Sequence, residues 1–410
     1  MRVCVVGGGA AGMMAASLIA KNGHEVCLFE KNEKLGKKIY ITGKGRCNVT
    51  NKAVGVDFLN KIVNGQKFMI SALSKFNSSD TIKFFEEAGV PLKIERGDRV
   101  FPVSDKSSDI IKGLENSLNQ TGVRVYKNCK IDNILIKNNA VFGVISENKE
   151  YCFDSVIVAT GGISYPSTGS TGDGYKFAEN AGHKIIKPVP ALCAIKLKNN
   201  ELVSLEGLSL KNVKLYAKLH NKKQFESEIG EMLFTRNGVS GPLVLTASSY
   251  VNRFDFESLK LYIDFKPAIK IEELLERINR DIEELKAKQI STLLEGFLPK
   301  SLVSIFTKML GLEPAFKANQ LSREKRHELA NLLKGFELVP LSLEDFNQAV
   351  VTSGGVNLKE INPKNMESKI IKNLYFVGEV LDIDALTGGF NLQLAFSTAA
   401  ACASDFEKID

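Results

Sequence analysis

The chain has 410 residues, of which 44% are hydrophobic and 25% charged, and its net charge is +7. This length predicts two or three domains, and the composition is ordinary for a soluble globular protein. No apolar run approaches the length of a membrane span, and glycines stand near the N-terminus where a signal peptide needs an apolar core. We therefore expect no membrane role and no export signal.

Seven cysteines without regular spacing predict reduced thiols and a cytoplasmic location. The positive charge would permit a nucleic-acid partner, but the lysines are scattered and only residues 34–46 gather several of them. We interpret these lysines as a solvated basic surface and do not expect a nucleic-acid partner. His183, His220 and His327 have no metal-ligand spacing, so we expect no metal.

The first residues of the chain predict a strand, a glycine turn and a helix. Residues 3–6 form a continuous β-rich apolar run, as in a buried parallel strand. Gly7, Gly9 and Gly12 follow it with the G-x-G-x-x-G spacing. Glycines at these positions allow a tight turn, close backbone approach to a pyrophosphate and close packing of the helix on the strand.

A second strand, residues 26–29, ends in Glu30, whose carboxylate can accept both ribose hydroxyls of an adenosine. Strand, turn, helix, strand and acid together predict dinucleotide binding, and the alternative is a glycine-rich turn in a generic α/β domain. The loop over residues 31–48 adds glycines and lysines that can wrap an extended, doubly negative dinucleotide. For Lys37 and Lys38 a solvated turn is an equal alternative.

Four segments resemble one bacterial flavoprotein family: "GGGAAGMMAA", "GKKIYITGKGRCNVTN", "VIVATGGISYPSTGSTGDGYKFAENAGH" and "LYFVGEVLDIDALTGGFNLQLAFSTAAACA". Members of this family are described as aminoacetone-oxidase-like or as 3-dehydro-bile-acid delta(4,6)-reductases. Because the segments lie at both ends and in the middle, the resemblance covers nearly the whole chain. It implies noncovalent FAD, an α/β fold with a glutathione-reductase-like, Rossmann-type FAD-binding domain, and an inserted β-barrel plus helical domain.

The sequence departs from the family pattern at two positions. Lys44 and Ala399 stand where the family often has glycine. The first adds a cation near the cofactor, and the second adds a methyl group where the backbone can approach closely. Neither change is expected to prevent FAD binding.

Cys47 raises the question of a redox thiol beside the cofactor. A disulfide-type flavin reductase needs two cysteines a few residues apart, but the next cysteine after Cys47 is Cys129. We therefore interpret Arg46, Cys47 and Asn48 as the loop that passes the ribityl chain and the flavin, with Cys47 as a packing residue. A redox role for this thiol is the alternative.

The middle of the chain returns to the FAD domain and then leaves it. A buried strand ending at Ala159 leads into Thr160 and Gly161 beneath the dinucleotide, and Ile131 resembles the position whose backbone meets the adenine. Alternating apolar segments and then amphipathic helical ones follow. We expect a β-barrel-like part over residues 191–268, a helical part over 269–344, and a discontinuous FAD-binding domain over 1–190 and 345–410.

The last segment predicts a strand that ends at Gly378 and Glu379, with Asp382 placed to bond ribityl hydroxyls. The following "TGGFN" begins a helix whose early turn points free N–H groups outward. The full set of predicted cofactor-binding residues is Gly7, Gly9, Ala10, Ala11, Gly12, Glu30, Lys31, Lys38, Gly43, Arg46, Cys47, Asn48, Ile131, Ala159, Thr160, Gly161, Gly378, Glu379, Asp382, Gly389, Phe390, Asn391 and Leu392.

The predicted function is FAD-dependent oxidoreduction of a small organic substrate by hydride transfer at flavin N5. Our first reading is an NAD(P)H-dependent reductase of an activated C=C bond, as in a 3-oxo steroid or bile acid. The alternatives are an oxygen-dependent aminoketone or amine oxidase and, less favoured, an RNA-modifying flavoprotein. The chain shows no second G-x-G-x-x-G after a strand, so NADH or NADPH would dock transiently. The sequence assigns no catalytic residue and no oligomeric state.

Overall fold

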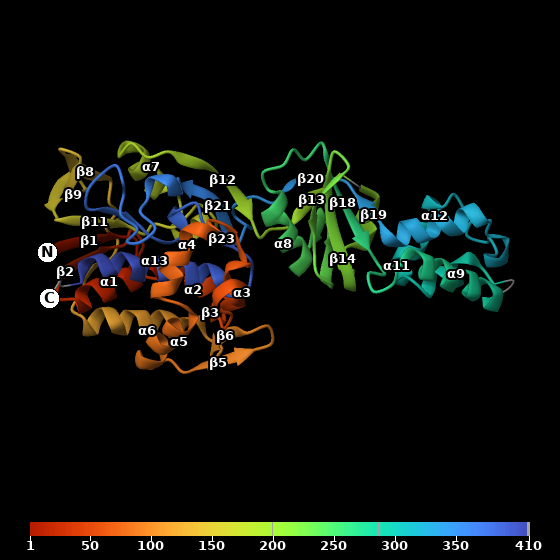
Figure 1. Ribbon diagram of the computed structural model, residues 1–410, viewed down its shortest axis with the longest axis horizontal. Helices are drawn as coiled ribbons and strands as arrows, with labels where there is room; N and C mark the ends of the chain where they lie inside the picture. The colour runs from red at the N-terminus through yellow and green to blue at the C-terminus, as the bar shows by residue number, and fades with distance from the viewer. Residues whose placement is uncertain (199, 286–287, 408–410) are drawn as a thin grey trace. The chain divides into compact units, whose positions relative to one another are not determined.

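A computed structural model describes residues 1–198, 200–285 and 288–407 of the chain (Figure 1). The chain divides into two compact units. The first unit comprises Met1–Ala191 and Asp345–Asp410, and the second comprises Leu192–Glu344. We predicted an insert over residues 191–344, and the second unit begins and ends next to these positions.

A five-stranded parallel sheet is the centre of the first unit. Its strand order is β22-β11-β1-β2-β7. The strands are β1 (Arg2–Val6), β2 (Glu25–Phe29), β7 (Arg124–Tyr126), β11 (Ser155–Val158) and β22 (Leu374–Phe376), and each pairs in parallel with its neighbours. Both ends of the chain therefore contribute to one sheet, as expected for a discontinuous Rossmann-type domain.

Helices cover one face of this sheet and an antiparallel sheet covers the other. Helices α1 (Ala10–Lys21) and α13 (Phe390–Ala403) pack against each other, and α6 (Ser107–Gln120) packs against α1. The opposite layer is the meander β8 (Asn133–Lys137), β9 (Ala140–Ser146) and β10 (Lys149–Cys152) (Figure 1). The predicted α/β fold with a Rossmann-type domain is confirmed, and this domain has three layers.

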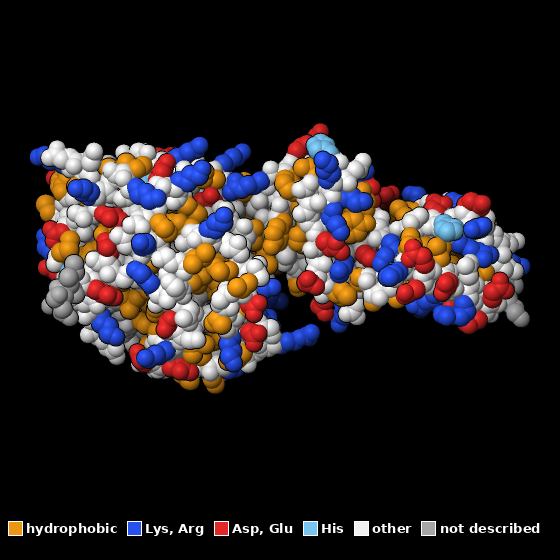
Figure 2. Space-filling view, in the orientation of Figure 1, with side chains coloured by type: hydrophobic (Ala, Val, Ile, Leu, Met, Phe, Trp, Pro, Cys, Tyr) orange, Lys and Arg blue, Asp and Glu red, His pale blue; other side chains and the backbone are white. Residues whose placement is uncertain are grey.

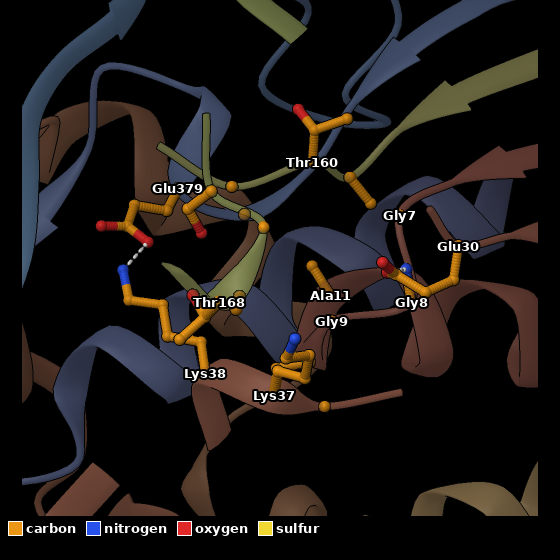
Figure 3. Close-up of a pocket in the computed structure, with 18 of the residues that line it drawn as sticks. Gly7, Gly8, Gly9, Ala11, Glu30, Lys37, Lys38, Thr160, Thr168 and Glu379 are labelled. Carbon is orange, nitrogen blue, oxygen red and sulfur yellow. Dashed lines mark hydrogen bonds and ion pairs between the residues drawn. The ribbon is translucent and has the colours of Figure 1, made fainter. Parts of the chain in front are cut away.

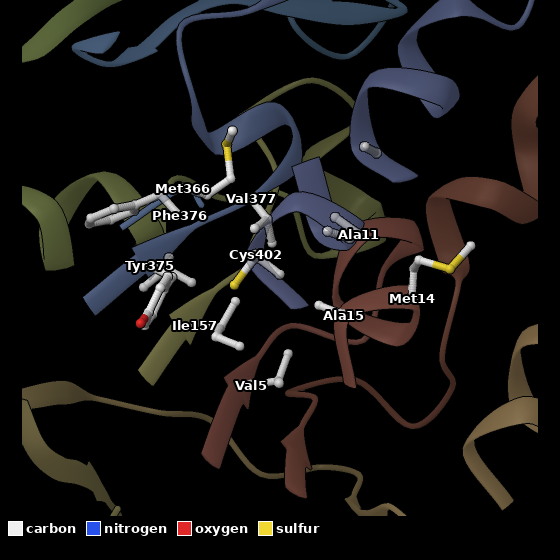
Figure 4. Packing of buried hydrophobic residues seen from close by; sticks show 14 of the residues in the cluster. Val5, Ala11, Met14, Ala15, Ile157, Met366, Tyr375, Phe376, Val377 and Cys402 are labelled. Carbon is white, nitrogen blue, oxygen red and sulfur yellow. The ribbon is translucent and has the colours of Figure 1, made fainter. Parts of the chain in front are cut away.

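Small side chains let the helices approach the sheet closely. Figure 4 shows Val5 and Ile157 of the sheet facing Ala15 of α1 and Cys402 of α13. All four side chains are fully buried. Because both helices are rich in alanine on this side, the layers interdigitate without large side chains to separate them.

The remaining elements of the first unit surround this core. They are α2 (Lys37–Ile41), β3 (Thr50–Asn51), α3 (Gly55–Leu59), β4 (Ile62–Asn64), α4 (Gln66–Lys75), α5 (Ser78–Glu87), β5 (Leu92–Glu95), β6 (Arg99–Pro102), α7 (Asp173–Asn180), β12 (Ile185–Ala191), β21 (Val351–Val356) and β23 (Asp384–Ala385). None of the helices in the described part of the chain is long and apolar enough to cross a membrane.

The second unit has its own sheet and its own apolar core. The sheet order is β19-β18-β14-β16-β17-β13-β20, with β15 paired to β14 and all pairings antiparallel. Its strands are β13 (Ile195–Leu197), β14 (Ser209–Leu219), β15 (Lys222–Glu226), β16 (Gly230–Thr235), β17 (Gly238–Ser240), β18 (Leu259–Asp264), β19 (Phe336–Leu338) and β20 (Pro340–Leu343). Its helices are α8 (Pro242–Val251), α9 (Ile271–Leu285), α10 (Ile290–Glu295), α11 (Lys300–Met309) and α12 (Arg323–Lys334).

The end of the range predicted as helical is strand. Residues 336–343 form β19 and β20, which return to the sheet after α12. In β19 the burial alternates, with Phe336 and Leu338 inside and Glu337 between them. This period of two is the pattern of a half-buried strand, and Gly335 ends the helix just before it.

Candidate cofactor site

At Gly7, in the turn after β1, and at Gly12, in α1, the structure leaves no room for a side chain. The Gly7 amide donates to the carbonyl of Phe29 at 2.8 Å, and a Cβ at Gly7 would lie 2.6 Å from the carbonyl oxygen of Ala159. A Cβ at Gly12 would lie 1.9 Å from the carbonyl oxygen of Gly7. At Gly9 a Cβ would meet nothing within 4 Å, so this glycine borders open space.

The N-terminus of α1 opens into that space. Gly9 is the N-cap, no side chain caps the helix, and its first turn has no acidic residue. The free N–H groups and the positive end of the helix dipole therefore favour an anion here, as the glycine spacing predicted.

One cavity collects most of the predicted cofactor residues (Figure 3). Its walls come from the β1–α1 turn, the loop after β2, the ends of β11 and β22, and the start of α13. The predicted residues that line it are Gly7, Gly9, Ala10, Ala11, Glu30, Lys31, Lys38, Ile131, Ala159, Thr160, Gly161, Gly378, Glu379, Asn391 and Leu392. Residues distant in the sequence thus meet at the carboxyl edge of the parallel sheet, where open α/β sheets bind ligands.

Glu30 is held by neighbours at the edge of this cavity. One carboxylate oxygen accepts the Gly8 amide at 2.8 Å, and the other accepts the Asn32 backbone and side-chain N–H groups at 2.8 and 2.6 Å. The residue is 8% exposed. These bonds fix the carboxylate beside the glycine turn, with lone pairs left for a ribose hydroxyl.

Two ion pairs join the loop after β2 to other walls. Lys31 donates to Asp173 at 2.6 Å, and Lys38 donates to Glu379 at 2.6 Å. Burial raises the pKa of the Asp173 carboxyl, but the hydrogen bond and charge of Lys31 outweigh this effect and hold the pKa below its usual range. Asp173 is thus a fixed negative partner for Lys31, and the Glu379 carboxylate accepts a hydrogen bond from Lys38 of α2.

A second helix begins at the cavity. Gly389 is the N-cap of α13 with φ of 94°, and a Cβ there would lie 2.4 Å from the Thr50 carbonyl. The first turn of α13 has no acidic residue. The Asn391 side chain pairs with the backbone of Ala385, donating to its oxygen at 2.7 Å and accepting its N–H at 2.9 Å. This pairing fixes the start of α13 beside the cavity.

Arg46, Cys47 and Asn48 do not line the cavity. Arg46 donates to Asp105 at 2.9 Å, forms an ion pair with Glu95, and lies 4.3 Å above the Phe101 ring. Cys47 is fully buried with φ of 58°, and burial raises the pKa of its thiol to about 12. These three residues are therefore absent from the lining of this cavity, and their contact with the flavin stays a prediction. Other predicted residues outside the lining are Gly12, Gly43, Asp382, Gly389 and Phe390.

Several lining residues were not predicted. Asn32 closes the turn after Glu30, and Thr168, Gly169, Ser170 and Asp173 line the cavity from the segment that leads into α7. The repeated Ser, Thr and Gly of "STGSTGDG" indicated a turn and a helix start, but they carried no sign that this turn would face the cofactor. That placement depends on the sheet, which brings the ends of β2 and β11 to the same edge.

The cavity suits a long dinucleotide with two negative charges. Two helix N-termini without acidic residues, α1 and α13, border it, and lysines and backbone amides lie between them. The Thr160 hydroxyl oxygen is buried at this wall without a hydrogen-bond partner among the described residues. Apolar residues such as Ile131 and Ala159 also line the cavity, and they can pack against the aromatic rings of a dinucleotide. These residues fit FAD.

The sequence matches the family model described as HI0933-like protein Rossmann domain over residues 1–405. The chain is 30% identical to a 3-dehydro-bile acid delta(4,6)-reductase of Clostridium scindens, covering 97% of both chains. It is 31% identical to a ribosomal RNA dihydrouridine synthase of Haemophilus influenzae, covering 98% of both chains.

The fold also resembles solved structures. A 3-ketosteroid delta1-dehydrogenase from Sterolibacterium denitrificans superposes with a TM-score of 0.51 at 12% sequence identity, covering 99% of both chains. At this identity the likeness concerns the fold alone. The chain belongs to the HI0933-like protein Rossmann domain family and is an FAD-dependent oxidoreductase.

Proposed function

We propose that this protein reduces a C=C bond conjugated to a carbonyl group, with noncovalent FAD in the cavity and NADH or NADPH as the transient electron donor. The observation that carries the proposal is the meeting of two uncapped, acid-free helix N-termini, those of α1 and α13, at one cavity. Bound FAD would supply hydride transfer.

The chain's own groups would bind and orient the cofactor. The α1 amides would hold the pyrophosphate and Glu30 the adenosine ribose. The N–H groups of Phe390, Asn391 and Leu392 at the start of α13 are preorganised donors, so they would stabilise negative charge that develops beside them.

Our first substrate class is a small enone such as a 3-oxo steroid acid. The relative named as a bile acid reductase supports it, because that name describes removal of ring double bonds. A uridine of RNA is a second candidate of the same chemistry, since its C5=C6 bond is also conjugated to a carbonyl. Two relatives named as ribosomal RNA dihydrouridine synthases support this second candidate.

A stacked aromatic pair with a nearby lysine is the feature of the second unit that supports RNA. Tyr216 and Tyr262 stack with ring centroids 5.0 Å apart, and Lys218 lies over them. The neighbouring Lys214 and Lys260 are paired with acids. Figure 2 shows cationic and anionic side chains interspersed over this unit on the face drawn. A broad basic stripe would favour RNA more strongly.

The test is anaerobic reduction followed by reoxidation. The FAD-loaded protein is mixed with NADH or NADPH, and we expect bleaching of the flavin absorbance with one of them. A 3-oxo-Δ4 steroid acid or unmodified ribosomal RNA is then added, and mass spectrometry reads a gain of two hydrogens. A gain of two hydrogens by the steroid supports the first substrate class, and the same gain by uridine supports the second. Bleaching by an aminoketone but by neither nicotinamide would replace the proposal with the oxidase.

A further inference from the structure

Lys38 and Glu379 form a closed hydrogen-bond cluster with Ser164 in the cavity wall. The Lys38 ammonium donates to Glu379 at 2.6 Å and to the Ser164 hydroxyl at 2.6 Å. Ser164 in turn donates to the other Glu379 oxygen at 3.0 Å, and that oxygen also accepts the Thr352 amide at 2.8 Å. Glu379 is therefore held by three donors.

The local structure fixes the direction of Lys38. Gly36, with φ of 67°, precedes α2, and a Cβ there would lie 2.9 Å from the Ile111 side chain. Ile39 is 2% exposed and anchors the short helix in the core. Lys38 is thereby turned to the cavity, where its side chain is 23% exposed and that of Glu379 is 21% exposed.

One donor of the ammonium has no protein acceptor. A lysine ammonium has three N–H donors, and the described residues accept two of them, one at Glu379 and one at Ser164. The third is free for a group in the cavity. Since Lys38 and Glu379 are both about four-fifths buried, their charges are screened less than those of a surface pair.

The cluster lies at the opposite end of the cavity from Glu30. Figure 3 shows the Lys38–Glu379 bond at one end and Glu30 beside Gly7 and Gly8 at the other. If Glu30 holds the adenosine, as the proposed function requires, the cluster lies at the flavin end. The inference below rests on that proposed function.

We infer that Lys38 and Glu379 form a charge-balanced pair that sets the reduction potential of the bound flavin. The Lys38 ammonium stabilises negative charge in the cavity, while Glu379 orients this ammonium and offsets its charge. Ser164 and Thr352 are positioning residues, because they hold the carboxylate in place. The two charges act on the flavin with opposite signs, so removing either one shifts the potential in a direction that identifies it.

The experiment measures the potential of FAD-loaded protein by equilibration with a reference dye, without NADH or NADPH. We expect Lys38→Met to lower the ratio of reduced to oxidised flavin about tenfold, which is about 30 mV for a two-electron couple. Glu379→Gln should raise it by a similar factor, and the double variant should return toward the parent. Lys334→Met is the matched control, because it breaks another 2.6 Å ion pair, to Asp264, at a similarly buried lysine that does not line the cavity, and it should shift the ratio less than twofold.

A shift of both single variants in the same direction, or no shift in either, would overturn the inference. If Lys38→Met retains little FAD, it is measured at saturating FAD, and Lys38→Arg, which keeps the charge, should keep the parent potential. Failure of the proposed function would look different: the parent would then bind no FAD, or would bind FAD that no nicotinamide reduces, whatever the potentials of the variants.

Discussion

Glu30 is the residue whose position most directly ties this sequence to a dinucleotide. Its carboxylate is oriented by Gly8 and Asn32 before any ligand arrives, so binding would not have to order it. Preorganisation of this kind lowers the entropic cost of binding.

We expect Glu30→Ala to purify with much less FAD than the parent while remaining folded. The substitution removes the ribose acceptor and also the bonds to the turn that begins α1. Flavin absorbance per protein and a titration at low added FAD measure the loss. Glu33→Ala is the control, since Glu33 lies in the same loop but has a side chain 58% exposed to solvent. Unchanged occupancy in Glu30→Ala would refute the assignment.

Cys47 is a buried thiol rather than an accessible one. With a pKa raised to about 12 by burial, roughly one thiol in ten thousand is ionised at pH 8, and the thiolate is the reactive form. We expect Cys47→Ser to keep flavin reduction within a few-fold of the parent. In the parent, a thiol reagent should label the exposed Cys152 long before Cys47. Loss of turnover with FAD still bound would restore the redox role.

Local sequence spacing could place Glu30 but could not place Arg46. The acid at position 30 follows a glycine fingerprint within one β-α-β unit, so its location is a matter of short-range geometry. Arg46 instead forms ion pairs with Glu95 and Asp105, which lie about 50 to 60 residues further along the chain. Since both acids reach it only through tertiary packing, the family resemblance led us to expect a flavin contact that the cavity lining does not include.

At the scale of elements, the N-terminus of α13 depends on a backbone that only glycine adopts easily. Gly389 combines a left-handed φ with contact to the Thr50 backbone. Gly45 has a similar φ of 85°, but a Cβ there would meet nothing within 4 Å. A side chain at Gly45 would therefore cause conformational strain alone, whereas a side chain at Gly389 would also cause a steric clash.

We expect Gly45→Ala to lower the free energy of unfolding by about 1–2 kcal/mol, the cost of the left-handed conformation. Gly389→Ala should cost clearly more, because its new methyl group also overlaps the Thr50 carbonyl. Denaturant titration of both variants with FAD in excess compares them. If both variants lose the same free energy of unfolding, the start of α13 moves to make room for the methyl group at no cost.

His183 links the end of α7 to the segment before β22. Its ring contacts Glu360 at 3.2 Å and Ser368 at 2.8 Å, and its side chain is fully buried. Burial lowers the pKa of the imidazole, although the hydrogen bond to Glu360 acts in the opposite direction. The folded state therefore binds a proton less readily than the unfolded chain.

It follows that His183 makes the protein less stable as the pH falls through about 6.5, where the unfolded histidine takes up its proton. We expect the free energy of unfolding to fall by up to about 1.4 kcal/mol per pH unit from this group. His183→Gln should lose that part of the pH dependence, whereas His220→Gln, at an exposed position, should keep it. If the free energy of unfolding changes with pH at the same slope in the parent and in His183→Gln, the assignment to His183 is wrong.

The type of most elements could be predicted, but their partners could not. Residues 123–136 contain two consecutive strands, β7 and β8, that do not pair with each other. β7 joins the parallel sheet beside β2, while β8 pairs with β9. Between them the amides of Asn128 and Cys129 bond the carbonyls of Asn32 and Glu30, so the chain follows the loop after β2 before it turns. Strand propensity has no information about this long-range pairing.

At the scale of the whole molecule, every residue that lines the cofactor cavity belongs to the first unit. Ala191, the last residue before the second unit, pairs with Val351 soon after it, so the two crossing points of the chain are neighbours. A short bridge could therefore replace the second unit without straining the sheet.

We expect a variant in which a short Gly-Ser linker replaces residues 192–344 to fold and to retain FAD. Circular dichroism and the flavin spectrum after gel filtration measure both properties. As a control, the same variant carrying Glu30→Ala should lose its flavin. A folded deletion variant without FAD would show that the second unit is needed for cofactor binding.

The order in which the ribosome releases the chain has a consequence for when the cofactor can enter. The second unit is one continuous stretch and ends at Glu344, so it can fold while the remaining residues are still being made. The cavity, however, needs β22 and the first turn of α13, which are translated after the second unit. A nascent chain thus carries the glycine turn and Glu30 before the second unit is made, but it can enclose FAD only afterwards.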